Sequence, residues 1–315
     1  MKAISKIAAL LLAVCIAVLF TGCGGNENNL SSSGADLAEK TKINIAALKG
    51  PTGIGMARLM EQNENGETAN DYNFTVSGAP DDVTAKLING EYDIAAVPTN
   101  NAAMLYNKTN GDIKMLALNT KGVLYMLDST NSIKSVSDLR GKKIYATGKG
   151  STPEYVLNYV LSQNGIDPEK DVEIEYLSEH AELATYIAAG TAQIALLPEP
   201  NVTTVLSSNE NVKIALNMTE EWDKIAKKES DGSILTMGCV VVRSEFLENN
   251  KEAVNAFLTE YQASINYTSE HLDETAQLCE KYEIIPKAAV AKKEIGRAHV
   301  RTPVTYADLV CRLLL

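Results

Sequence analysis

Two glycine-containing stretches carry the groups best suited to binding a small polar ligand. The first follows a short apolar run and consists of Lys49, Gly50, Pro51, Thr52, Gly53 and Ile54. The second consists of Gly148, Lys149, Gly150, Ser151 and Thr152. Glycines let backbone N–H groups approach a ligand closely, and a helix that begins at such a loop adds a partial positive charge. Each stretch is therefore a candidate ligand loop, with a tight turn that binds nothing as the alternative for the first.

Known enzyme motifs do not fit these loops. A phosphate-binding P-loop ends in Gly-Lys-Ser/Thr, but the first loop continues as Gly55-Met56-Ala57. The dinucleotide fingerprint needs a third glycine where Arg58 stands. The sequence also lacks a G-x-S-x-G motif, a suitably placed Cys/His pair and a cysteine–histidine spacing typical of zinc. We therefore expect no catalytic residues, no metal and no cofactor.

Further polar residues follow predicted strands. Pro98, Thr99 and Asn100 come after one apolar strand, and Glu199 comes after another. Ser178 and His180 follow a third, alternating strand. We count these residues as ligand-binding candidates because ligands of open α/β sheets bind at the carboxyl ends of strands. The alternatives are a structural histidine, a helix cap at Ser178 and a solvated loop carboxylate at Glu199.

Other conspicuous residues have structural interpretations. Ser151 and Glu154 have the spacing of a capping box. Trp222 lies near a predicted helix start and is expected to pack rather than to contact ligand. Cys239 lies in an apolar run and is expected to be a buried free thiol, although a Cys239–Cys279 disulfide is the alternative.

The elements that position these residues alternate between strands and helices. Two segments, Leu87–Pro98 and Ile187–Pro198, share a helix–Gly–strand–Pro frame at an offset of one hundred residues. Such a spacing is too long for a solenoid repeat and predicts two similar α/β lobes. Two continuous apolar runs, Gly122–Leu127 and Ser233–Val242, are expected to cross between the lobes and form the hinge.

The predicted organisation has five parts. Residues 1–22 form a signal peptide, with Lys2 and Lys6 before an apolar run, and residues 23–42 form a polar, flexible tether. Residues 43–126 and 237–294 form lobe I, and residues 127–236 form lobe II. The net charge of −11 argues against a nucleic-acid partner, which demands a basic face.

Both ends of the chain carry special signals. Phe20-Thr21-Gly22-Cys23 resembles a bacterial lipobox, which makes Cys23 the expected site of lipidation; cleavage without lipidation is the alternative. Residues 296–305 resemble the translation of a synthetic sequencing adapter. We therefore expect residues 295–315 to be a non-native tail and draw no function from them; an unusual genuine tail is the alternative.

One segment resembles a known family specifically. Ser135-Val136-Ser137-Asp138-Leu139-Arg140-Gly141-Lys142-Lys143-Ile144, followed by the second glycine loop, resembles extracytoplasmic solute-binding proteins of ABC importers. The two glycine loops look like those of the nitrate, sulfonate, taurine and thiamine-precursor class. The resemblance covers about residues 43–294 and implies a type II periplasmic-binding-protein-like fold, in which two Rossmann-like lobes are joined by two crossing strands.

The resemblance also implies a function. The chain is expected to be a monomeric, lipid-anchored extracytoplasmic protein that closes on a small solute and then docks on an ABC permease with its ATPase. Lys49 and Lys149 favour an anion such as a sulfonate or nitrate, whereas Glu179 and Glu199 favour an amino-substituted heterocycle. An enzyme acting on a small carboxylate and a sensory surface lipoprotein remain as alternatives.

Overall fold

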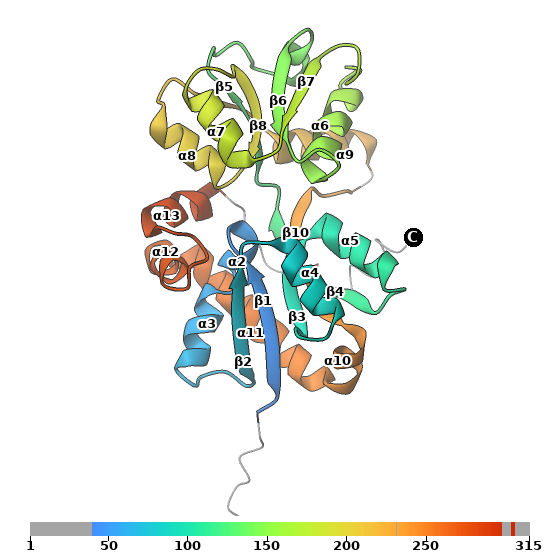
Figure 1. Ribbon diagram of the computed structural model, residues 1–315, viewed down its shortest axis with the longest axis vertical. Coiled ribbons are helices and arrows are strands. Elements are labelled where there is room, and N and C mark those ends of the chain that lie inside the picture. Colours follow the sequence, from blue (N-terminus) through green and yellow to red (C-terminus); the bar gives the residue numbers. More distant parts are fainter. Residues whose placement is uncertain (1–39, 231, 298–303, 306–315) are drawn as a thin grey trace, which may run out of the picture. The chain divides into compact units, whose positions relative to one another are not determined.

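The computed structural model describes residues 40–230, 232–297 and 304–305. Helices and strands alternate along this part of the chain and form two mixed sheets, each covered by helices on both faces (Figure 1). The α/β class expected from the sequence is therefore confirmed. The predicted signal peptide, Cys23 and residues 298–303 and 306–315 of the predicted tail lie outside the described residues.

The first sheet has six strands in the order β11-β4-β10-β3-β1-β2. β1 pairs in parallel with β2 and β3, whereas β10 runs antiparallel to β3 and β4. The strands are β1 (Lys42–Leu48), β2 (Asp71–Ser77), β3 (Ile94–Pro98), β4 (Ile113–Lys121), β10 (Thr236–Arg243) and β11 (Val304–Thr305).

The second sheet has five strands in the order β7-β6-β8-β5-β9. β6 pairs in parallel with β7 and β8, whereas β5 runs antiparallel to β8. The strands are β5 (Leu124–Asp128), β6 (Lys143–Thr147), β7 (Glu173–Leu177), β8 (Ile194–Pro198) and β9 (Lys213–Asn217). The boundary after residue 126 that the sequence suggested falls inside β5, which pairs only within this second sheet.

The two sheets repeat one topology. When only the three parallel strands of each sheet are counted, the first lies between the second and the third, and an antiparallel strand lies beside the third. The third strands are Ile94–Pro98 and Ile194–Pro198, the same two segments that the sequence comparison paired. Both are almost wholly buried, as expected of strands that have helices on both faces.

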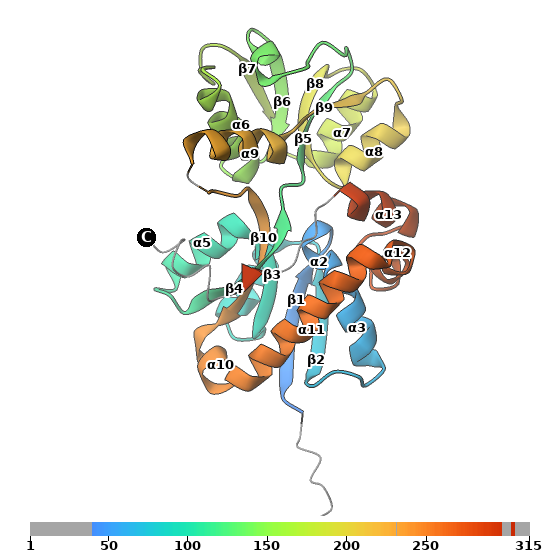
Figure 2. The same cartoon turned by 180° about the vertical axis from the view of Figure 1, so that it is seen from behind.

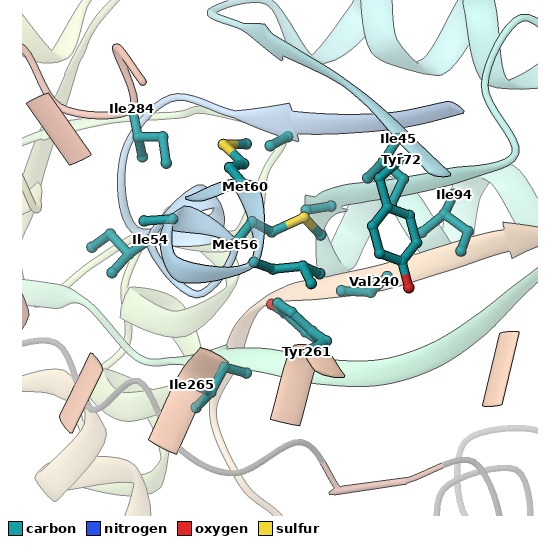
Figure 3. Close-up of a cluster of buried hydrophobic side chains, with 14 of the residues drawn as sticks. Ile45, Ile54, Met56, Met60, Tyr72, Ile94, Val240, Tyr261, Ile265 and Ile284 are labelled. Carbon is teal, nitrogen blue, oxygen red and sulfur yellow. The ribbon is translucent and has the colours of Figure 1, made fainter. Parts of the chain in front are cut away.

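Alternation along the strands divides the side chains of the first sheet between two cores. Ile43 and Ile45 point to one face, where they pack with residues of α3 and α11. Figure 3 shows Ile45 in this cluster together with Met60 of α3 and Tyr261 of α11. Ala46 and Leu48 point to the other face and pack with residues of α4 and α5. The helices associated with this sheet are α2 (Pro51–Ile54), α3 (Ala57–Glu64), α4 (Pro80–Ile88), α5 (Thr99–Lys108), α10 (Ser244–Asn249), α11 (Lys251–Glu270), α12 (Leu272–Lys281) and α13 (Ala288–Arg297).

The second sheet is covered in the same way. Leu124 and Met126 pack with residues of α6 and α9, whereas Tyr125 and Leu127 pack with residues of α7 and α8. The helices of this sheet are α6 (Thr152–Gln163), α7 (His180–Ala188), α8 (Asn201–Ser208) and α9 (Met218–Glu229), with a 3-10 turn at η2 (Val136–Leu139). Trp222 packs on Tyr159, with ring centroids 4.4 Å apart, as predicted.

Two helical segments are interrupted in the structure. α10 ends at Asn249 and α11 begins at Lys251, because Asn250 has φ −133° and ψ 41°, outside the helical region. The helix after the first glycine loop divides into α2 and α3.

Cys239 and Cys279 are both buried and free, and burial raises the pKa of each thiol to about 12. The free thiol predicted at Cys239 is therefore confirmed.

The chain crosses between the sheets twice. It leaves the first sheet after Lys121 and joins the second at Leu124, and it returns to the first sheet at Thr236. Gly122, in the first crossing, lies against Thr219 and Leu235: a Cβ atom there would stand 2.0 Å from Thr219 Oγ1 and 3.0 Å from Leu235 Cδ2. Only glycine fits this crossing without displacing its neighbours. Across the described residues, none of the helices combines the length and the hydrophobicity needed to span a bilayer.

Candidate functional site

The predicted site residues follow the carboxyl ends of strands, beside the two crossings. At the edge of the first sheet, Pro98 pairs with Gly238, and Lys121 pairs with Thr236. At the edge of the second sheet, Leu124 pairs with Pro198. Both third strands therefore end at the level where the chain passes from one sheet to the other. This is the position in open α/β sheets where ligands bind.

The first glycine loop is fixed mainly by its own backbone. Lys49 N–H donates to Ser77 O at 2.9 Å, Gly50 N–H to Ile284 O at 2.9 Å, and Gly53 N–H to Gly50 O at 3.0 Å. Gly50 has φ +90°, which favours glycine. Gly53 and Ile54 are buried, whereas Pro51 and Thr52 are half-buried. Several N–H groups expected to face a ligand are therefore already used inside the protein.

Asn119, which the sequence reasoning missed, holds this loop from beneath. Its Nδ2 donates to Thr52 O at 3.1 Å and to the Tyr261 hydroxyl at 3.0 Å, while its Oδ1 accepts from Thr120 Oγ1 at 3.0 Å. Asn119 and Thr120 are each under 5% exposed. A polar pair near the end of an otherwise apolar strand was the signal for this network, because buried amides need partners.

The second glycine loop turns through two residues in the left-handed region, Gly148 (φ +73°) and Gly150 (φ +75°). The capping box predicted from Ser151 and Glu154 does not form. Ser151 Oγ donates instead to Gly148 O at 2.6 Å, and Glu154 Oε2 accepts from Gly150 N–H at 2.5 Å. The glutamate reaches past the N-cap residue because the tight glycine turn brings the earlier N–H closer.

Lys149 and Tyr176 lie together beside this loop. Lys149 is exposed, and its Nζ stands 5.9 Å from the centroid of the Tyr176 ring. The Tyr176 hydroxyl is buried and has no hydrogen-bond partner within the described part of the chain. Burial and the nearby charge of Glu154 raise its pKa to about 12, so the hydroxyl keeps its proton at neutral pH. A neutral donor and a lysine therefore stand at one strand end.

His180 is bonded to the end of the neighbouring strand. Its Nδ1 lies 2.5 Å from the hydroxyl of Thr147, a fully buried residue. Burial lowers the pKa of His180 below its ordinary 6.5, an effect that Glu179 partly opposes. The helix begins at His180 with Glu179 as its N-cap residue, so Ser178 does not occupy the cap position and remains an exposed loop residue.

Glu199 is 3% exposed, which overturns the solvated-carboxylate alternative. Its side chain accepts hydrogen bonds from Thr203 N–H at 2.9 Å and Thr203 Oγ1 at 3.1 Å. Glu199 therefore provides an acceptor for a backbone N–H group in the first turn of α8, where the helix dipole also favours a negative charge. The side chain of Lys49, by contrast, is 47% exposed and reaches Glu283 at 3.8 Å. The carboxylate of Glu199 is therefore buried, whereas the ammonium group of Lys49 is accessible to solvent.

Three buried hydroxyls at strand ends lack hydrogen-bond partners among the described residues: those of Thr99, Tyr176 and Thr219. Thr99 begins α5 after β3, and Asn100, beside it, is half-buried. Thr219 follows β9 and touches the crossing at Gly122. Buried hydroxyls without a partner are uncommon and costly, so their position at the ends of strands favours polar groups kept for a partner such as a ligand or water.

The described residues contain no group of three or more His, Cys, Asp or Glu side chains placed to hold a metal ion. The groups assembled at the strand ends are hydrogen-bond donors, two lysines and one buried carboxylate. Their chemistry is that of holding a polar molecule.

Comparisons with known proteins agree with this description. The sequence model of a family described as the periplasmic phosphonate substrate-binding proteins of ABC transporters matches residues 119–286. The binding protein YtlA of Bacillus subtilis (strain 168) is 37% identical over 62 residues, which cover 20% of this chain and only 19% of that protein.

Solved structures show the same fold. An ABC transporter protein from Parabacteroides distasonis has a TM-score of 0.69 and 25% identity, covering 85% of this chain and 88% of that chain. The periplasmic aliphatic sulphonate-binding protein SsuA from Escherichia coli has a TM-score of 0.66 and 18% identity, covering 84% and 86%. The resemblance seen in the sequence and the two-lobed type II fold are thereby confirmed.

The Asn119 network predicts a measurable loss of stability. Asn119→Ala removes the donor to Thr52 O and to the hydroxyl of the buried Tyr261. We expect the free energy of unfolding in urea to fall by about 1–3 kcal/mol. Asn107→Ala, at an exposed position in α5, is the control. Equal effects of the two substitutions would show that the network does not hold the loop.

His180 predicts a dependence of stability on pH. Its pKa is lower in the folded protein than its ordinary 6.5, so the unfolded chain binds more protons as the solution is acidified. The stability contributed by the neutral imidazole is present above pH 6.5 and is lost as the pH falls below it. Comparing unfolding free energies at pH 5 and 7.5, we expect His180→Gln to flatten this dependence, by at most about 1.4 kcal/mol per pH unit. His271→Gln, at an exposed position, is the control and should leave this dependence on pH as in wild type. If His180→Gln also left it unchanged, His180 would not be its source.

Proposed function

Because this chain belongs to the family of periplasmic phosphonate-type substrate-binding proteins of ABC transporters, we propose that it captures a small polar solute for an ABC importer. The solute would bind between the two lobes, and rotation about the two crossings would close the lobes on it. The observation that carries this proposal is that glycine loops, and buried hydroxyls without a hydrogen-bond partner among the described residues, follow or lie at the carboxyl ends of strands in both sheets.

The residues proposed to contact the solute come from both sheets. From the first sheet these are Thr52 and the loop around Lys49, together with Thr99 and Asn100. From the second sheet they are Lys149, Thr152 and His180, with Tyr176 added because its hydroxyl lacks a partner among the described residues. Closure would exclude water and strengthen each hydrogen bond to the solute.

We propose that the solute carries an oxyanion, such as a phosphonate or sulfonate group. Lys149 is exposed, lacks an ion-pair partner within the described residues, and stands at the start of α6, whose first N–H groups and dipole favour negative charge. Accessible lysines attract an anion, whereas a buried carboxylate repels one. Glu199 is the observation that favours the second candidate, an amino-substituted heterocycle.

The proposal extends to the delivery of the solute and to the location of the protein. The closed protein would dock on a permease whose ATPase drives import, as members of this family work with such components. We further propose that the chain acts outside the cytoplasm as a monomer, tethered to the membrane through lipid on Cys23, and that it has no catalytic activity of its own.

Binding of defined probes tests this proposal. Isothermal titration of the full chain with ethylphosphonate, ethanesulfonate, nitrate and a 4-aminopyrimidine should show binding of at least one oxyanion, weakened by added salt. Lys149→Ala should weaken that binding roughly tenfold or more, since a charge-assisted hydrogen bond contributes about 1.5–3 kcal/mol. Lys170→Ala is the matched control, because Lys170 is exposed near the opposite end of β7.

The same titration separates the candidates. Binding of the aminopyrimidine alone, abolished by Glu199→Gln, would replace the oxyanion with the heterocycle. Binding of none of the probes would contradict both ligand classes.

A further inference from the structure

The last described helix, α13, bridges the helices of the two sheets. It packs along α12 and touches α2, both associated with the first sheet, and its Ala291 belongs to the core of that sheet. On its other side it contacts α8 of the second sheet, where Lys293 Nζ donates to Ser207 Oγ at 3.1 Å. Figures 1 and 2 show α13 beside both α12 and α8 from opposite directions. Any movement of one lobe against the other must therefore change this contact.

Glu294 stands at the centre of this bridge. Its side chain is 0% exposed, and neither carboxyl oxygen has a hydrogen-bond partner within the described residues. A buried ionised carboxylate without a partner is strongly unfavourable, whereas the protonated form is tolerated. The contact as it stands therefore requires the neutral acid.

The groups around Glu294 add to this requirement. The carboxylate of Glu199, which precedes α8, opposes ionisation of Glu294 by electrostatic repulsion. On α12, the thiol of Cys279 is close enough to Glu294 for the charge of Glu294 to raise the pKa of the thiol. The four residues of α2 include no titratable side chain. On α13 itself, Lys293 is exposed and bonded to Ser207, and Lys292 pairs with Asp273. Burial first, and Glu199 second, raise the pKa of Glu294 to about 8.

We propose that α13 is a proton-dependent latch between the lobes: protonated Glu294 lets α13 pack against α8, and its ionisation beside Glu199 releases that contact. The proton passes to solvent, and two like charges are left in a buried place. This regulation goes beyond capture of a solute and does not depend on which solute is bound. Its effect is to free the second lobe in mildly alkaline solution.

The effect of pH on the equilibrium between latched and released protein follows from the different proton binding of the two forms. The latched form holds its proton up to about pH 8, whereas a released and solvated Glu294 would have an ordinary value near 4.5. Between these values the latched form binds more protons, so raising the pH favours release. From pH 6.5 to pH 9 the ratio of latched to released protein should fall by roughly thirtyfold.

Hydrogen exchange on the ligand-free full chain tests the latch. Exchange of peptides covering α8 and α13 is measured at pH 6.5 and pH 9, corrected for the intrinsic rate, with α6 as the internal reference. We expect wild-type α8 and α13 to lose at least roughly tenfold in protection at pH 9 while α6 does not. Glu294→Gln, which mimics the neutral acid, should keep its protection at both pH values. Glu210→Gln, at an exposed position close after α8, should behave as wild type.

Two results would overturn the latch. One is equal protection of α8 and α13 in wild type and Glu294→Gln at pH 9. The other is loss of that protection in a folded Glu294→Gln already at pH 6.5. If Glu294→Gln does not fold, the wild-type protein alone tests the latch. An equal change in protection across α6, α8 and α13 between pH 6.5 and pH 9 would then exclude a local latch. Since no solute is present, failure of the latch is distinguishable from failure of the binding proposal.

Discussion

The two halves of the structure are held together by two crossings of the chain, each of which leads directly into a central strand of the next sheet. The first sheet is completed by β10, which arrives from the second lobe and is inserted between β3 and β4. The second sheet is completed by β5, which follows directly after β4 of the first and is inserted between β8 and β9. Neither sheet is whole without a strand that the chain brings across. The lobes are therefore linked by two short connections of the chain, and rotation about these connections is the movement that we expect.

This arrangement also decides where the polar residues gather. Antiparallel insertion brings the start of β10 beside the end of β3, and the start of β5 beside the end of β8. The carboxyl ends of the parallel strands thus meet the crossings in both halves. Two buried acids, Glu199 and Glu294, lie near this level, whereas Lys149 remains accessible. In our account, solute capture and the proton-dependent contact of α13 both use this level of the molecule.

The sequence predicted the repeated parts of the fold because they leave periodic signals. The third strands, Ile94–Pro98 and Ile194–Pro198, were recognised from the shared Gly and Pro around an apolar run. The limits of helices were less predictable: Asn250 breaks a segment that is amphipathic on both sides of it. The capping spacing at Ser151 was misleading, since glycine geometry redirected Glu154, whereas a capping box does form at Ser135 and Asp138. Asn119 and Glu294 matter through partners or burial distant in sequence, which local patterns cannot reveal.

We propose that the two lobes, which are joined by two crossings of the chain, close on a small solute. Small-angle X-ray scattering of the full chain, unfolded and refolded to remove carried solutes, tests it most directly when an oxyanion that binds is added to saturation. We expect the radius of gyration to decrease on binding, and we expect Lys149→Ala to need a higher concentration of the oxyanion to show the same decrease. Saturation of the site with an unchanged scattering curve would contradict closure of the lobes.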